Sequence, residues 1–452
     1  MAAAGAVEAE VVVGEAVAVV NDGIYRIREM MIFIQRRNSM YSACLLISSR
    51  KIWSLAVISL LLAGVAIAPP VSAQGSIFEQ PPVFRASSLL PPDLLTGASY
   101  KLKEEVTMEG MLFSFDLWSR YGWYHPQSLD MLKIRLAEIR ALDALTAMKQ
   151  DPLFLEGVWD QAKGTGESTI DAVKHPFKTV ANIPLGLHKF GKQVHARTLE
   201  GDTLPDDEVR FIHEKAKREL AVSLGVDPYS DNRPLQEALN QVATNKNRGA
   251  LATRIGTAFI PAAGPALGAA QLNKGLQERL ASLSASELQV ETRKNLIQLG
   301  VSKSETDLFI RNPGYSPSVR AAITEAMEGL AGVSGVQNYI HVIQEVPAPE
   351  VALFFQRRIQ LAEKFHRSVR PLDKMITIGA TPVFLDRNGN IAVGISVDYL
   401  YWNENLASRI KQIRAKLGKA RCDLCITGTC SPLAKEKLAA LGITVHEEWG
   451  KN

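Results

Sequence analysis

Alternating apolar and polar positions predict an antiparallel sheet over roughly residues 98–126. In the stretch MLFSFDLWSRYGWY, Phe113, Phe115 and Leu117 alternate with polar residues, which is the two-residue period of a half-buried strand. Glycines punctuate the stretch and favour turns. We therefore expect a small antiparallel sheet in this part of the chain.

The residues after this sheet have the three- and four-residue apolar period of a helix. Ser128 is a suitable N-cap, and Asp130 falls in the first turn. The apolar stripe consists of Leu129, Leu132, Leu136, Ile139 and Leu142. The charged residues that lie off this stripe are Lys133, Arg135, Glu138 and Arg140. We expect the helix to close the sheet, and we predict one sheet-plus-helix region over 74–202.

Residues 203–370 carry short helical periods. Thr203 is a suitable cap for the first helix, and Gly225 ends it. The next stretch, VDPYSDNRP (226–234), is predicted to be a turn; it resembles an oxygen-rich cation loop but lacks the spacing and the closing Glu of a calcium loop. Further helices are predicted at 234–245, 284–299, 303–311, 316–330, 335–345 and 348–367. Because Gly, Pro and Ser interrupt them without a regular period, we predict an irregular helical bundle.

The last part of the chain changes to a strand-rich pattern. Asn388-Gly389 between apolar runs predicts a β-hairpin, and a helix is expected at 402–418. CDLCITG then predicts a strand, and SPLAKEKLAALG predicts a helix with Ser431 as its cap. This order predicts a small α/β domain over 371–452. The fold class is therefore predicted to be α+β and mostly helical, with an N-terminal sheet, a central helical bundle and this C-terminal domain.

The uncharged run from Ile52 to Ala68 has the features of an export signal. Basic residues precede it, and Val71 and Ala73 supply the small residues of a cleavage site. We predict a signal peptide over 40–73 that is cleaved after Ala73. An uncleaved inner-membrane anchor formed by 52–68 is the alternative, although the run is short for a spanning helix. Since signal peptides begin near a chain start, residues 1–39 are interpreted as an upstream extension that precedes the true start codon.

Composition and charge exclude nucleic acid as a partner. The chain has 452 residues, of which 46% are hydrophobic and 22% charged, the balance of a folded globular protein. Its net charge of +4 is spread thinly, whereas a nucleic-acid-binding surface needs concentrated basic residues. Gly-x-Ser-x-Gly, His-Glu-x-x-His and a Gly-x-Gly-x-x-Gly that follows a strand are absent from the sequence. We therefore predict no catalytic residues and no cofactor.

Three cysteines lie within a short stretch of the C-terminal domain. If CDLCITG is a strand, Cys422 and Cys425 point to opposite faces and cannot hold one zinc ion jointly. We therefore predict no metal site; the alternative is a zinc site formed by Cys422, Cys425, Cys430 and His446. The sequence does not decide whether Cys425 and Cys430 form a disulfide across the turn.

The turn before the last predicted helix contains the candidate ligand-binding residues. Thr427, Gly428, Thr429 and Ser431 place hydroxyls and backbone amides at a helix N-terminus, which favours an anion. Such turns are common in α/β units, so this site is a hypothesis of low specificity.

The segment IGTAFIPAAGPALGAAQL (255–272) is uncharged and consists mostly of small residues. Its glycines recur at multiples of four, which permits close helix approach in a membrane or a core, whereas its prolines break a single helix. A surface for a protein partner or a membrane is one interpretation of the segment. A buried loop is the other.

These patterns support two functional hypotheses. The first is an exported protein of the periplasm or cell envelope that has no enzymatic activity and acts on an unknown protein partner or a membrane surface through 255–272. The second is a periplasmic enzyme or ligand-binding protein with its site in the C-terminal domain, near Thr427 to Ser431.

Overall fold

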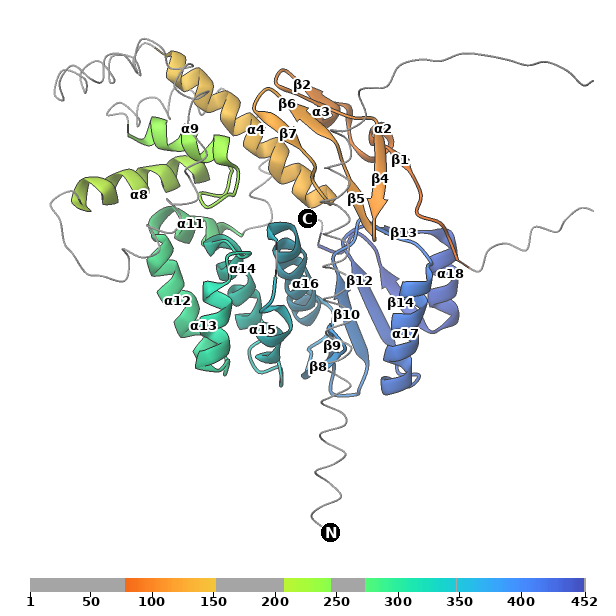
Figure 1. Cartoon of the computed structure of the whole chain (residues 1–452). Helices are drawn as coiled ribbons and strands as arrows, with labels where there is room; N and C mark the ends of the chain where they lie inside the picture. The colour runs from red at the N-terminus through yellow and green to blue at the C-terminus, as the bar shows by residue number, and fades with distance from the viewer. Residues whose placement is uncertain (1–77, 152–206, 245–272, 347, 451–452) are drawn as a thin grey trace, which may run out of the picture. The chain divides into compact units, whose positions relative to one another are not determined.

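The computed structural model describes residues 78–151, 207–244, 273–346 and 348–450. These residues form a mixed α+β fold (Figure 1). The described residues of Gln80–Ile376 and Val383–Asn452 belong to one compact unit. Among the described helices, none has the length and apolar character needed to cross a membrane. The predictions for 1–39, for the signal peptide 40–73 with its apolar run 52–68, and for 255–272 concern residues outside the described ranges.

Two small antiparallel sheets form the N-terminal part. The first has the order β1 (Phe84–Arg85), β4 (Glu105–Glu109) and β5 (Leu112–Ser114), and the second has the order β2 (Thr96–Gly97), β3 (Tyr100–Leu102), β6 (Leu117–Ser119) and β7 (Gly122–Tyr124). Two short helices, α2 (Ala86–Leu89) and α3 (Pro92–Leu95), lie between β1 and β2 along the chain. Phe113, Phe115 and Leu117 are buried, as their alternation predicts. The alternating stretch contributes to both sheets because the chain leaves β5 before it enters β6.

Helix α4 (Leu129–Gln150) closes this core, as expected. The Ser128 side chain accepts a hydrogen bond from the Met131 amide at 3.1 Å, which confirms it as the N-cap. The apolar stripe of α4 packs on the sheets through Leu132, Leu136 and Ile139. Two of the charged residues that lie off this stripe, Arg135 and Glu138, are nevertheless buried. Their partners come from a distant loop, which the helical period alone does not reveal.

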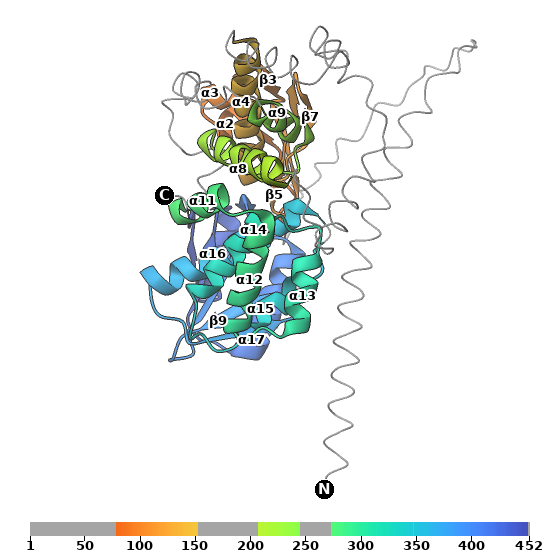
Figure 2. The ribbon, with the colours of Figure 1, turned by 90° about the vertical axis from the view of Figure 1, so that its left-hand side faces the viewer.

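Helices dominate the middle of the chain. Their bounds are α8 (Asp207–Ser223), α9 (Arg233–Ala243), α11 (Lys274–Ser282), α12 (Ala285–Gln298), α13 (Lys303–Arg311), α14 (Pro317–Glu328), α15 (Asn338–Ile343) and α16 (Pro349–Ser368). Ser284, Ser302 and Ser316 cap α12, α13 and α14 with their side chains, so these helices begin at the predicted places. Helix α14 packs between α12 and α16 (Figure 2). Thr203 lies outside the described residues.

The C-terminal part contains a mixed five-stranded sheet in the order β14 (Ile443–His446), β12 (Cys422–Ile426), β10 (Ile391–Ile395), β9 (Thr381–Leu385) and β8 (Lys374–Ile378). Strands β10, β12 and β14 are parallel, whereas β9 and β10 form the antiparallel hairpin that Asn388-Gly389 predicts. Gly389 has φ +77°, a conformation that favours glycine. Helix α16 lies on one side of the parallel strands, and α17 (Glu404–Leu417) and α18 (Pro432–Ala440) lie on the other (Figure 1).

A short connection joins the C-terminal sheet to the N-terminal sheets. Strand β11 (Tyr399–Leu400) pairs with β13 (Thr429–Cys430) in parallel. The Asp398 carboxylate accepts the Phe113 amide at 2.9 Å and the Leu129 amide at 3.1 Å. In return, the Asp398 amide donates to the Met111 carbonyl at 3.0 Å. Asp398 therefore ties the end of β10 to the first sheet and to the start of α4.

Candidate functional site

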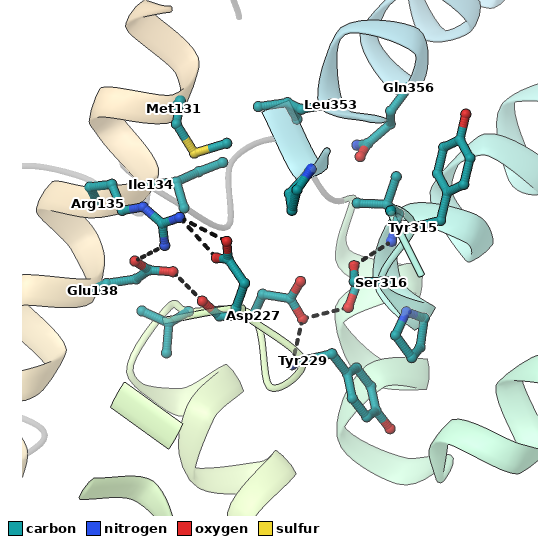
Figure 3. Close-up of a pocket in the computed structure, with 18 of the residues that line it drawn as sticks. Met131, Ile134, Arg135, Glu138, Asp227, Tyr229, Tyr315, Ser316, Leu353 and Gln356 are labelled. Carbon is teal, nitrogen blue, oxygen red and sulfur yellow. Dashed lines mark hydrogen bonds and ion pairs between the residues drawn. The ribbon is translucent and has the colours of Figure 1, made fainter. Parts of the chain in front are cut away.

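A cavity of about 320 Å³ opens among helix α4, the loop 226–232, the loop 313–318 and helix α16 (Figure 3). Its volume falls at the lower end of the range for small-molecule sites. Most of the wall is apolar, and the side chains that line it include Met131, Ile134, Val226 and Leu353. The charged groups gather on the side formed by α4 and the loop 226–232 (Figure 3).

The loop 226–232 is the turn that the sequence VDPYSDNRP predicts. Asp227 accepts the Tyr229 amide at 2.8 Å, the local turn that aspartate side chains favour. Asn232 caps α9 by accepting the Leu235 amide, and its own side-chain amide donates to Glu138 at 2.8 Å. The loop is thus fixed both to the helix that follows it and to α4.

An ion cluster made of the buried Arg135 and Glu138 and the exposed Asp231 connects this loop to α4. Arg135 donates to Glu138 Oε2 at 2.8 Å and to both Asp231 oxygens at 2.8 and 3.1 Å. The Ser230 hydroxyl donates to the other Glu138 oxygen. Glu138 and Asp231 therefore share one guanidinium, and neither oxygen of Glu138 lacks a donor.

Asp227 differs from these two carboxylates because no cation contacts it among the described residues. The Ser318 hydroxyl and the Tyr229 amide both donate to its Oδ1, whereas Oδ2 accepts no hydrogen bond from a described residue. Burial raises the pKa of Asp227 to about 6, and the charges of Glu138 and Asp231 act in the same direction. Asp227 is therefore the carboxylate in the cavity that still lacks a positive partner.

The opposite wall is held rigidly by backbone contacts. The Tyr315 hydroxyl donates to the Ile343 carbonyl at 2.7 Å, and a Cβ at Gly314 would lie 2.5 Å from the Val346 carbonyl oxygen. Gln356 of α16 is only 2% exposed, and its side-chain amide makes no hydrogen bond to a described residue. Because Gln356 lines the cavity, its amide is a polar group positioned for a ligand (Figure 3).

The charge of the cavity wall is negative. Arg135 is the one cationic residue among the described residues that line it, and it pairs with Glu138 and Asp231 but not with Asp227. The described residues contain no group of three or more His, Cys, Asp or Glu side chains that could hold a metal ion. The chemistry of the cavity therefore fits an organic cation with an apolar body better than a metal ion or an anion.

The residues predicted as an anion site make structural contacts. The Thr427 hydroxyl donates to the Val397 carbonyl at 2.7 Å and accepts the Val397 amide at 2.9 Å. Gly428 packs so tightly that a Cβ would overlap the carbonyl oxygen of Asp398. Ser431 is buried and caps α18 by accepting the Ala434 amide at 3.0 Å, and Thr429 is exposed in β13. These four residues are brought together, and their binding role stays a prediction.

The cysteine segment forms the strand, turn, helix and strand that the sequence predicts. Cys422 and Cys425 lie on β12, and no disulfide joins them to each other or to Cys430. His446 Nε2 lies 2.8 Å from Asp423 Oδ1, so the histidine pairs with a carboxylate. Cys425 stands opposite His446 in the strand register, but burial raises the pKa of its thiol to about 12. A thiolate nucleophile is therefore disfavoured at this position.

The cavity is not predictable from the sequence because its wall comes from four separate segments. The turn 226–234 and the helix over 129–150 are each predictable, but their contact is not. One feature of the sequence could have pointed to this site. Arg135 and Glu138 lie three residues apart on α4 and off its apolar stripe, as an ion pair would. The turn 226–234, rich in Asp and Asn, provides an acceptor for Arg135 and a donor for Glu138.

Comparisons with known proteins give no relative for this chain. No family model, no curated protein and no solved structure matches it.

Proposed function

We propose that this chain is an exported protein of the cell envelope that works by binding, and that its cavity takes a small organic molecule with one protonated amine. Asp227 carries the proposal. It is the carboxylate of an acidic cavity that faces no cation among the described residues, and its Oδ2 has no donor there.

The other wall residues contact the uncharged parts of the ligand. The apolar wall formed by Met131, Ile134 and Leu353 covers the hydrocarbon part of the ligand. The Gln356 amide supplies a donor and an acceptor that fix its orientation. An anion is disfavoured because Glu138 and Asp231 already neutralise Arg135 and leave no cation available to it.

A binding role fits the wall better than catalysis. The described side chains that line it include no histidine, cysteine or lysine, so the hydroxyls of Ser318 and Ser230 have only the carboxylates of Asp227 and Glu138 as adjacent bases. The hydroxyls of Ser316 and Ser318 are already engaged, the first as the cap of α14 and the second as a donor to Asp227.

The experiment uses phenethylamine as the probe, with 2-phenylethanol as its neutral analogue and 3-phenylpropionate as its anionic one. Calorimetry and thermal unfolding are expected to show binding of the amine and not of the analogues. Binding is expected to strengthen between pH 5 and pH 7, because Asp227, with a pKa of about 6, becomes charged over that interval.

Asp227→Asn keeps the hydrogen bonds to Tyr229 and Ser318 while it removes the charge, so it is expected to fold and to lose at least about tenfold in affinity. Gln356→Leu tests the orienting amide. Asp93→Asn, at an exposed acid outside the cavity, is the matched control and is expected to bind normally. Equal binding of the amine and the alcohol, or unchanged affinity in Asp227→Asn, would contradict the proposal.

A further inference from the structure

The outer face of the second N-terminal sheet exposes two tryptophans side by side. Trp118 on β6 is paired in register with Trp123 on β7, and their side chains are 57% and 66% exposed. The inner face of β6 is buried, with Leu117 at 0% exposure. Alternation along the strands therefore places both indoles outward, where they add little to the core.

Two cations lie near these indoles in the sheet. Lys101 on β3 stands opposite Trp118. Arg120 lies in the turn between β6 and β7, where its guanidinium donates to the Ala98 carbonyl at 3.3 Å and lies over the Tyr121 ring. Neither cation forms an ion pair with a described acidic side chain. His125 stacks on Trp123 at a centroid distance of 5.6 Å with 24° between the ring planes.

The acidic group on this face is already occupied. Asp116 lies 2.7 Å from His125 Nδ1 and 3.4 Å from Lys103 Nζ. Lys103 also contacts Glu105 at 3.4 Å. Lys101 and Arg120 thus remain as positive charges that flank the two indoles without compensation by described residues.

We propose that this surface, made of Lys101, Trp118, Arg120 and Trp123, binds the headgroup layer of an anionic lipid membrane. Indole rings are amphipathic and favour the boundary between water and hydrocarbon. Lys and Arg beside them are attracted to anionic headgroups. The proposal concerns a different surface from the cavity and does not depend on the ligand proposed there.

The positive charge of Lys101 and Arg120 favours an anionic membrane over a second copy of the chain or a neutral sugar. A second copy that docked by the same face would bring Lys101 and Arg120 against the same cations, which is unfavourable. A neutral sugar would leave both cations uncompensated. A membrane with anionic headgroups satisfies the indoles and the cations together.

The test is co-sedimentation with vesicles of phosphatidylcholine alone and with vesicles that contain about one third phosphatidylglycerol. All proteins begin at Gln74, so that Ile52–Ala68 does not itself bind lipid, and they keep the whole compact unit. Wild type is expected to bind the anionic vesicles, to bind neutral ones far less, and to be released by salt. Its tryptophan emission is expected to shift to the blue on binding.

Trp118→Thr with Trp123→Thr is expected to weaken binding at least about tenfold. The matched control is Val290→Thr, which removes a 68% exposed apolar side chain from α12. Lys101→Gln with Arg120→Gln is expected to abolish the preference for anionic vesicles, whereas Lys294→Gln with Lys411→Gln, at exposed lysines elsewhere, is not. Circular dichroism confirms that each variant folds.

Three outcomes would overturn the proposal. The first is vesicle binding by the folded double-tryptophan variant within twofold of wild type. The second is equal binding to neutral and anionic vesicles. The third is self-association that depends on Trp118 and Trp123 in a wild-type protein that leaves vesicles unbound.

Discussion

Asp398 holds separate parts of the chain together, and its effect on the unfolding free energy depends on pH. Its carboxylate is buried and accepts two backbone amides, those of Phe113 and Leu129. Burial raises its pKa to about 7, and although these two hydrogen bonds lower it, they do not offset burial. At neutral pH the molecule therefore carries a partly desolvated charge at a structural junction.

The stability of the protein is expected to decrease as pH rises from about 4 to about 7 through the titration of Asp398. The folded state keeps a proton in this interval that the unfolded state, with a pKa near 3.8, has already released. The two values differ by about three units, which corresponds to up to about 4 kcal/mol of unfolding free energy. Asp227 titrates in the same direction, with a folded pKa of about 6.

Asp398→Asn is expected to raise the unfolding free energy at pH 8 and to change it little at pH 5, because the amide oxygen keeps both acceptor contacts without the charge. Asp398→Ala is expected to lower it by about 2 kcal/mol or more at both pH values, since two buried amides lose their acceptor. Urea denaturation at the two pH values measures both variants, with Asp93→Asn as the exposed control. Equal pH dependence in wild type and Asp398→Asn would contradict this account.

At the scale of elements, local sequence signals were sufficient to predict helix caps and turns. They did not predict the contacts between elements. The caps Ser128 and Ser431 and the turn at Gly389 are fixed by nearby backbone groups, so the sequence predicts them. The burial of Arg135 depends on Asp231, which is 96 residues away. No local period can encode such a pair, and for the same reason the cavity could not be predicted.

Strand β12 allows a test of the cysteine prediction. Its alternation places Cys425 toward α16, in a core that contains Phe365, and Cys422 toward the other side of the sheet. Replacing Cys422, Cys425 and Cys430 together with Ala is expected to lower the unfolding free energy by about 1 kcal/mol for each buried thiol.

Metal analysis of the wild-type protein accompanies this triple variant and is expected to find no stoichiometric zinc. A chelator is expected to leave the unfolding midpoint unchanged. If the chelator unfolded the C-terminal sheet, a structural metal would be present, because metal-binding energy contributes directly to folding.

At the scale of the whole molecule, the proposed export predicts a defined mature end. Mass spectrometry of protein recovered from the cell envelope is expected to find Gln74 as the N-terminal residue. Ala73→Arg is expected to block cleavage because the final position of the signal requires a small residue, whereas Ser72→Gln is expected to be processed normally. Recovery of the chain in the cytoplasm with residues 1–73 attached would contradict export.

The Asp398 junction also constrains the order of events during synthesis. Phe113 and Asp398 are separated by 285 residues, and the ring of Phe84 packs against Tyr399 at a centroid distance of 5.0 Å. At about 5–20 residues per second, the ribosome needs roughly 15–60 s to cover that separation. The N-terminal sheets therefore emerge first, but their contacts with Asp398 and Tyr399 can form only after the C-terminal part has been made. A chain that crosses a membrane from its N-terminus would stay incompletely folded, and dependent on holding chaperones, until its final strands had followed.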